Sequence, residues 1–573
     1  MIQAIELDNF KGIAARQRIE FAPLTLLFGA NSAGKSTILQ ALLYLHELLE
    51  RGTADVDRTE LGGDVLELGG FARLVHRHEI ERAIVLRVEF ATPGGLERFG
   101  RDLTNFPFPD LDDEVDSAWL ELTVRFRTSA TFRGPLVERA KVGVNGIAEP
   151  LVWLETGTSL RDGEPLQARV NLGHPLLATE RRKLPGAVVT ETDGAQHPLT
   201  APHAPAEVTE AWEAIAIPQG EDGEGSRSRS RSRSGARSHS VSRSGSGAKT
   251  GSVSGAGSGS GAGLGDGSGF GDGRSLPVFA ISRSRLSALP PSNEPLRVIP
   301  FGDESPEKAA ATAQVRTFLE MVVLGTTAQL VSFLRDAIYI GPLRTIPPRG
   351  FLYERAGRIT SWADGLAAWD LLLADRVSLV ERTNLWLKRL GTGCQVIVQQ
   401  LFDRGADAEE LSGGHVDKTV RRLLLDTGAG SFVLPSEVGA GVSQVIPVVV
   451  AALDGRSGLS LIEQPEIHVH PAVQVALGDL LIDAVTREGS RRTLLIETHS
   501  EHLILRLLRR IRETAEKELP EGAPTFTDDK LSVLYVESGR DGVRIRRLRV
   551  DERGEFKDRW PKGFFAERME ELL

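Results

Sequence analysis

Gly29-Ala30-Asn31-Ser32-Ala33-Gly34-Lys35-Ser36 is the stretch of this sequence that decides its fold. It follows the apolar segment Leu24–Phe28 and opens the segment Lys35–Leu49, whose apolar residues recur at helical spacing. The predicted order is therefore strand, glycine-rich loop and helix. Glycines let such a loop curl until successive backbone N–H groups point at one spot, at the positive end of the following helix. The pattern GxxxxGK(S/T) is complete and predicts a phosphate-binding loop.

The side chains of this loop have separate predicted roles. Lys35 is expected to neutralise the β- and γ-phosphates of ATP, Ser36 to give its hydroxyl to Mg²⁺, and Thr37 to lie beside the phosphates. The backbone of the other loop positions is expected to cradle the phosphates: Gly29, Ala30, Asn31, Ser32, Ala33 and Gly34. A glycine-rich turn before an ordinary helix is the alternative interpretation. The strand before the loop and the helix after it disfavour that alternative.

Two further apolar segments end in polar residues far along the chain. Leu459–Ile462 reads as a strand that ends at once in Glu463, and a carboxylate at such a strand tip can orient the waters of Mg²⁺. Leu494–Glu497 reads as another strand, which delivers His499 at its end. His499 can hydrogen-bond a γ-phosphate or the attacking water. Taken singly, such residues are more often a cap and a satisfied core histidine, but their order behind a phosphate loop favours the functional reading.

Composition excludes several classes of protein. Of the 573 residues, 41% are hydrophobic and 25% charged, which is typical of a globular chain, and the net charge of −10 gives no global excess of positive charge for nucleic acid. Cys394 is the single cysteine, so an intramolecular disulfide is excluded and a reducing compartment is expected. The N-terminus does not resemble a signal peptide, and the longest apolar run, Val445–Leu453, is shorter than the roughly 20 residues that span a bilayer. A cytoplasmic protein without a membrane segment is expected.

The chain divides at a low-complexity segment. Residues 219–275 hold 17 Gly and 16 Ser with almost no large apolar side chains, so they are predicted to form a disordered linker. Its SRSRSRSRS run is either an electrostatic arm for nucleic acid or an acidic partner, or a solvated spacer. The flanking blocks, 1–218 and 276–573, are predicted to be the N-terminal and C-terminal lobes. In the first, residues 127–218 read as irregular and rich in turns, as part of an irregular β-rich insertion in that lobe.

These motifs together resemble a known family. PLTLLFGANSAGKST (23–37), IEQPEIHVHP (462–471) and ETHSE (497–501) resemble the ABC-type ATPase head of SMC and recombination-repair proteins, and most closely the bacterial OLD-like AAA ATPases. The resemblance covers about residues 1–92 and 335–573. It also includes YIGPLRTIPPRG (339–350) and WPKGFF (560–565), for which no chemistry is assigned. It implies an α/β P-loop NTPase fold of two lobes, with a mixed sheet and flanking helices.

The resemblance also implies a composite site in which the signature loop of one protomer covers ATP on another, and hence a homodimer. Leu411–Gly414 spells the ABC tetrapeptide LSGG, but it lies far upstream of Glu463 and continues into β-like sequence. The segment Ser436–Gln444 instead opens a helix directly before the Leu459 strand. A signature works through exposed N–H groups at a helix N-terminus. We therefore assign the signature to Gly439, Gly441, Ser443 and Gln444.

The sequence departs from the family at the end of the Leu459 strand. ABC-type ATPases usually place a second acid where this chain has Gln464, and an amide orients water but cannot accept its proton. Glu466 is the candidate replacement base; otherwise turnover is slow. The first-lobe glutamine that usually reaches Mg²⁺ is also not assigned, and residues 69–75 stand where it is expected.

Two functions follow from the sequence. The first is an ATPase that dimerises around ATP and drives or licenses a DNA-acting partner, such as a nuclease, in repair or anti-phage defence; direct DNA contact stays open. The second is a nucleotide-gated binding module with little turnover. A metal-dependent hydrolase built on Glu466, His468, His470, His499 and His502 is disfavoured, because the resemblance already explains His499. A nuclease in this chain is not predicted, because Leu531–Glu537 carries one acid and no DxD follows it.

Overall fold

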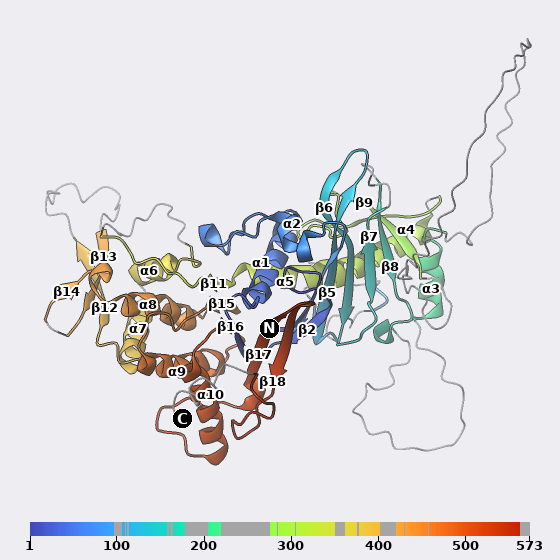
Figure 1. Ribbon diagram of the computed structural model, residues 1–573. Coiled ribbons are helices and arrows are strands. Elements are labelled where there is room, and N and C mark those ends of the chain that lie inside the picture. Colours follow the sequence, from blue (N-terminus) through green and yellow to red (C-terminus); the bar gives the residue numbers. More distant parts are fainter. Residues whose placement is uncertain are drawn as a thin grey trace, which may run out of the picture.

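The computed structural model describes most of the chain. The described residues are 1–96, 106–108, 111, 114–157, 160, 164–177, 204–218, 276–282, 285–303, 305–349, 361–374, 377–401, 420–428, 430–455 and 458–561. The predicted linker 219–275, the LSGG tetrapeptide 411–414 and residues 562–565 of WPKGFF lie outside them. Three sheets and their flanking helices form an α/β fold, which confirms the predicted class (Figure 1).

A six-stranded mixed sheet lies at the centre of the molecule. Its strands, in spatial order, are β11 (Ile338–Ile340), β15 (Leu459–Glu463), β16 (Thr493–Glu497), β3 (Leu24–Gly29), β17 (Leu531–Gly539) and β18 (Gly542–Leu548). All neighbours are parallel except β17 and β18, which form an antiparallel hairpin. The N-terminal strand β3 therefore lies between two strands from the C-terminal part of the chain.

Helices cover both faces of this sheet. The helices are α1 (Ser36–Arg51), α6 (Leu366–Leu373), α7 (Val377–Arg389), α8 (Ala440–Leu453), α9 (Pro471–Thr486) and α10 (Glu501–Glu516). Strand β3 is fully buried, and its alternate residues enter two different cores: Leu26 packs with α8, α9 and α10, while Leu27 packs with α1. The predicted strand, loop and helix around the phosphate loop are confirmed, with boundaries shifted by one or two residues.

A nine-stranded antiparallel sheet forms the other half of the molecule, on the right in Figure 1. Its strands, in spatial order, are β10 (Arg297–Ile299), β9 (Val278–Ser282), β8 (Leu166–Val170), β7 (Val152–Glu155), β6 (Arg133–Val144), β5 (Ser117–Thr128), β4 (Ile84–Ala91), β1 (Ile2–Asp8) and β2 (Gln17–Glu20). Residues 127–218, expected to be an irregular and turn-rich part of a β-rich insertion, are more regular than their sequence pattern indicates. This stretch holds β6, β7, β8 and the helix α3 (Ala206–Glu213).

The physical reason for this difference lies in β6. Its sequence, RGPLVERAKVGV, carries glycine, proline and charged residues that weaken the alternation of a strand. The strand forms because β5 pairs with it over eleven positions, with one irregularity in register after Thr123. Cross-strand contacts of this kind outweigh local preference. The nine strands come from both sides of residues 219–275, since β9 and β10 follow that segment.

The remaining elements include a long apolar helical segment. Helix α4 (Pro306–Leu319), a π-helical turn (Glu320–Gly325) and α5 (Thr326–Arg335) are continuous. Residues 306–335 are long and apolar enough to cross a membrane by length and composition, but 72% of their most apolar window is buried inside the protein, as in a core helix. The short helix α2 spans Gly70–Leu74. A third sheet holds β12 (Gln395–Leu401), β13 (Val420–Asp426) and β14 (Phe432–Val433), and β13 and β14 form an antiparallel pair.

Candidate functional site

The phosphate loop joins β3 to α1 at the carboxyl edge of the central sheet. Gly29 has a φ of 149°, and a Cβ at this position would lie 2.4 Å from the carbonyl oxygen of Val536 in β17. Gly34 has a φ of 96°, which also favours glycine. Trp560 braces the strand below, because its ring centroid lies 5.5 Å from that of Phe28. The backbone curl that the sequence predicted is therefore enforced by packing on β17 and by glycine geometry.

Lys35 is buried inside this loop, with 3% of its surface exposed. Its Nζ donates hydrogen bonds to the carbonyl oxygens of Gly29 at 3.2 Å and Ala30 at 3.0 Å. Burial lowers the pKa of Lys35, and the nearby carboxylate of Glu497 opposes that shift. The Lys35 amine is therefore held inside the loop at the end of β3, and its contact with phosphates stays a prediction.

Two glutamates end neighbouring strands beside the loop. Glu463 closes β15 and Glu497 closes β16, and the two residues are paired in register. The Ser36 hydroxyl donates to Glu497 Oε2 at 2.7 Å, and Lys35 Nζ lies 3.7 Å from Glu497 Oε1. The sequence reasoning missed Glu497, because it used only His499 from that segment. The available signal was a second apolar strand ending directly in a glutamate.

Glu463 is a buried and hydrogen-bonded carboxyl group. It is 8% exposed, and the Tyr339 hydroxyl donates to its Oε1 at 3.0 Å. Burial, and then the negative charge of Glu497, raise the pKa of Glu463 to about 7. Two neighbouring buried carboxylates thus repel each other, and a cation between them would relieve this repulsion.

A pH dependence of stability follows for the protein in EDTA. Because the pKa of Glu463 is raised from 4.5 to about 7 in the fold, its contribution to stability is present below pH 4.5 and is lost as the pH rises through 7. The loss is on the order of 3 kcal/mol. Denaturant unfolding at pH 5 and pH 8 measures it. The variant Glu463→Gln should show a smaller decrease over this range, and an identical decrease in both proteins would contradict the assignment.

Glu466 and His499 lie together at the same edge. The backbone N–H of His499 donates to Glu466 Oε1 at 2.7 Å, and Glu466 Oε2 is buried without a hydrogen-bond partner among the described residues. Burial raises the pKa of Glu466. Burial and then the charge of Lys35 lower the pKa of His499, so its imidazole is neutral at pH 7. A carboxylate with one uncommitted oxygen and a raised pKa is suited to accept a proton.

Gln464 has a different role in this arrangement. It has a φ of 45°, its backbone N–H donates to the Glu497 carbonyl at 2.7 Å, and its own carbonyl accepts from Arg344 at 3.1 Å. These hydrogen bonds of Gln464 thus run through its backbone. They fix the turn that follows Glu463 and carries Glu466 beside His499.

The predicted signature residues divide into two pairs. Gly439 precedes the first residue of α8 and is exposed, and a Cβ on Gly441 would lie 2.4 Å from the His468 carbonyl oxygen. Ser443 and Gln444 are buried instead: the Ser443 hydroxyl donates to the Pro435 carbonyl at 2.7 Å. Within this chain the side chains of the second pair therefore stabilise the start of α8. Contact of any of the four residues with nucleotide stays a prediction.

Arg344 connects the start of α8 to the end of β15, and sequence reasoning gave it no role. Its guanidinium donates to the carbonyl oxygens of Glu463 at 2.6 Å and Gln464 at 3.1 Å. The Gln444 side chain bonds the Arg344 backbone N–H at 3.2 Å. Burial lowers the pKa of Arg344 to about 10, so it stays charged at neutral pH. In the sequence, the only indication of a role for Arg344 was its place in the YIGPLRTIPPRG segment.

The histidines of the disfavoured metal site serve other purposes. His468 is exposed with a φ of 63°, and His470 Nδ1 accepts from the Ala472 N–H at 3.2 Å, which caps α9. Among the described residues, no group of three or more His, Cys, Asp or Glu side chains is placed to hold a metal ion.

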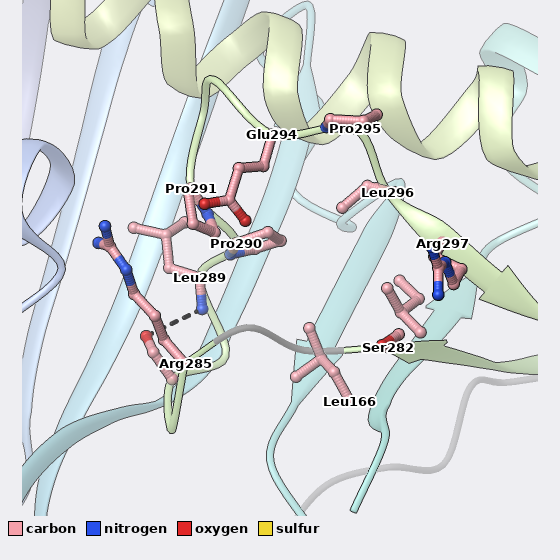
Figure 2. Close-up of a pocket in the computed structure, with 12 residues that line it drawn as sticks. Leu166, Ser282, Arg285, Leu289, Pro290, Pro291, Glu294, Pro295, Leu296 and Arg297 are labelled. Atoms are coloured by element: carbon pink, nitrogen blue, oxygen red, sulfur yellow. Dashed lines mark hydrogen bonds between the residues drawn. The ribbon is translucent and has the colours of Figure 1, made fainter. Parts of the chain in front are cut away.

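Two pockets lie at different places on the molecule. One of about 540 Å³ lies between the phosphate loop and the β17–β18 hairpin, and is lined by Ala30, Asn31, Ala33, Tyr535–Gly542 and Arg544. Another, of about 280 Å³, lies beside β8, β9 and the edge strand β10 of the nine-stranded sheet (Figure 2), with Arg285, Glu294 and Arg297 in its lining. The second pocket contains none of the site residues described above. The first extends the phosphate loop toward β17, on the side of β3 away from Glu463.

Comparison with known proteins supports the assignment of the two ends of the chain. The AAA ATPase domain family matches residues 1–80. A second family, described as an AAA domain, putative AbiEii toxin, Type IV TA system, matches residues 346–506. No curated protein matches the sequence. Both ends of the chain therefore resemble AAA-type ATPase domains, and these matches include the phosphate loop, Glu463 and His499.

Solved structures of SMC heads are also similar to this chain at low identity. An SMC head bound to the C-terminal winged-helix domain of ScpA has a TM-score of 0.34 and 9% identity, over 96% of this chain and 98% of that one. The SMC head from Thermotoga maritima has a TM-score of 0.33 and 8% identity, over 96% and 99%. Scores this low add nothing to the fold described above.

Proposed function

We propose that this chain binds MgATP and hydrolyses its β–γ phosphoanhydride, as an OLD-like ABC-type head. One observation carries the proposal: Lys35 and Ser36 of the phosphate loop lie against Glu497, one strand away from Glu463, where Glu466 and His499 also meet. A positive charge, a hydroxyl and strand-end carboxylates at one edge of a parallel sheet are the groups that phosphoryl transfer requires.

Each residue of the site has a separate role in this reaction. Ser36 and Glu463 offer hard oxygen ligands, which fit Mg²⁺. When bound, Mg²⁺ supplies neutralisation of the phosphate charges. Lys35 binds the β- and γ-phosphates, and the free oxygen of Glu466 accepts the proton of the attacking water. The neutral His499 hydrogen-bonds the γ-phosphate or that water.

A homodimer completes the site in this proposal. The N-terminus of α8, at Gly439 and Gly441, presents backbone N–H groups to ATP held by a second chain. This sequence has a single phosphate loop, which supports such an arrangement. The signature loop that covers ATP on one chain then comes from a second chain.

The wider role of the protein is proposed from resemblance. We place it in the cytoplasm, with ATP-driven closure of the heads licensing a separate DNA-acting effector such as a nuclease, in repair or anti-phage defence. The toxin–antitoxin label of the matched AAA domain is compatible with a defence role. The second candidate, a nucleotide-gated module with little turnover, is favoured by Gln464, which stands where a proton-accepting acid is usual.

Assembly tests the composite site. The variant Gly439→Arg should abolish the dimer that MgATP induces, because its side chain fills the space in front of the α8 N-terminus. Gly439 suits this test better than Gly441, since a Cβ on Gly439 meets nothing within 4 Å, whereas one on Gly441 strikes the His468 carbonyl. Light scattering with a slowly hydrolysed ATP analogue measures the dimer fraction.

Gly455→Arg is the matched control for this substitution. Gly455 follows the other end of α8, about 20 Å away along the helix axis, and a Cβ there also meets nothing within 4 Å. The Gly455→Arg variant should dimerise like the parent protein. A parent that stays monomeric at saturating nucleotide, or equal dimerisation of both variants, would count against closure by the α8 N-terminus.

A further inference from the structure

Glu497 has no role in the ATP site proposed above, although it lies next to the phosphate loop. It is 6% exposed, next to the 8% exposed Glu463 on the adjoining parallel strand, so two carboxylates leave the sheet side by side. Tyr339 donates to Glu463, but Glu497 is bound by the two phosphate-loop side chains with assigned roles, Ser36 and Lys35. Because the Glu497 carboxylate is buried against the Ser36 hydroxyl and the Lys35 amine, its negative charge affects the binding of phosphates and cations by the loop.

The carboxyl groups of this cluster favour a bound cation. Glu463, Glu466 and Glu497 lie at this edge beside the cations Lys35 and Arg344, so full ionisation of the three carboxyl groups leaves one negative charge in excess. Adding the phosphates of ATP to this cluster is unfavourable unless a cation enters with them. Carboxylate and hydroxyl oxygens are the ligands that Mg²⁺ prefers.

We propose that Glu497 is a further ligand of the Mg²⁺ that accompanies ATP, alongside Ser36 and Glu463. The inference rests on the proposed function. Its geometric basis is the 2.7 Å hydrogen bond between the Ser36 hydroxyl and Glu497 Oε2: a cation bound by that hydroxyl lies within reach of this carboxylate. Residues 69–75, where a first-lobe ligand was expected, contain no glutamine and form α2 with its flanking residues. Glu497 supplies a ligand from β16 instead.

Metal binding and nucleotide binding should respond to Glu497→Gln in opposite directions. The amide keeps an oxygen for the Ser36 hydroxyl but removes the charge. With a non-hydrolysable ATP analogue present, the affinity for Mn²⁺, measured by electron paramagnetic resonance, should fall by about tenfold or more. In EDTA, the affinity for the same analogue without metal should rise several-fold, because one repelling charge is gone.

Glu516→Gln is the control, because Glu516 is exposed at the end of α10, about 24 Å along the helix from the site. It should leave both affinities unchanged. Unchanged Mn²⁺ affinity in Glu497→Gln would overturn the proposal and leave Glu497 as a partner that only positions Ser36 and Lys35. Binding of the ATP analogue to the parent protein is measured first. If the parent protein binds no analogue, the proposed function is overturned as well.

A second variant keeps the test valid if Glu497→Gln fails to fold, as judged by circular dichroism. Glu497→Asp keeps the charge but withdraws the carboxylate by one methylene. The Mn²⁺ affinity should fall while the affinity for the metal-free analogue stays at the parent value. Parent-like Mn²⁺ affinity in the folded aspartate variant would overturn the proposal.

Discussion

Replacement of Lys35 by alanine is expected to weaken MgATP binding by about 10²-fold or more, since charged hydrogen bonds to two phosphates are lost. Lys35 is the only lysine or arginine in residues 29–37, and its Nζ lies inside the loop against the carbonyls of Gly29 and Ala30. The fold should survive, because the substitution removes a buried charge and leaves Glu497 bound to Ser36. Calorimetry with a non-hydrolysable ATP analogue measures the loss.

Lys388→Ala is the control, because Lys388 is an exposed lysine in the last turn of α7. It should bind the analogue like the parent. Unchanged affinity in a folded Lys35→Ala protein would exclude residues 29–36 as the nucleotide site.

Substitution of Glu466 by glutamine is expected to lower ATP turnover by roughly 10²-fold or more while ATP binding stays near the parent value. The glutamine can still accept the His499 N–H, which now bonds Glu466 Oε1, so the turn should keep its shape. Only the proton-accepting oxygen is lost. Steady-state phosphate release, with and without DNA, measures turnover.

Two companion variants separate the two proposed functions. His499→Ala should also lower turnover if the chain is an ATPase, through loss of a γ-phosphate contact. If turnover is incidental, Glu466→Gln should do little, and Gln464→Glu should raise the rate by restoring an acid directly after Glu463. A parent rate equal to that of Lys35→Ala under every condition would reject the ATPase and leave the nucleotide-gated module.

Sequence patterns were sufficient where the signal is local. The phosphate loop, its flanking strand and helix, and the two strands that end at Glu463 and Glu497 were all predicted, because apolar periodicity and glycine spacing act over a few residues. The nine-stranded sheet was only partly predicted. Strands such as β6 depend on a partner strand for their stability, and their own residues do not indicate that partner.

By itself, the sequence determined which residues the loop and the strand ends present: Lys35, Ser36, Glu463 and His499 each follow from a local motif. Only the tertiary structure decided the partners of these residues. Ser36 meets Glu497 across 461 positions, and Arg344 meets Glu463 across 119. Both contacts exist because β3 inserts next to β16, and because a buried guanidinium must find carbonyl oxygens wherever the fold provides them. Strand order and buried hydrogen bonding are properties of the whole chain, and no short motif encodes them.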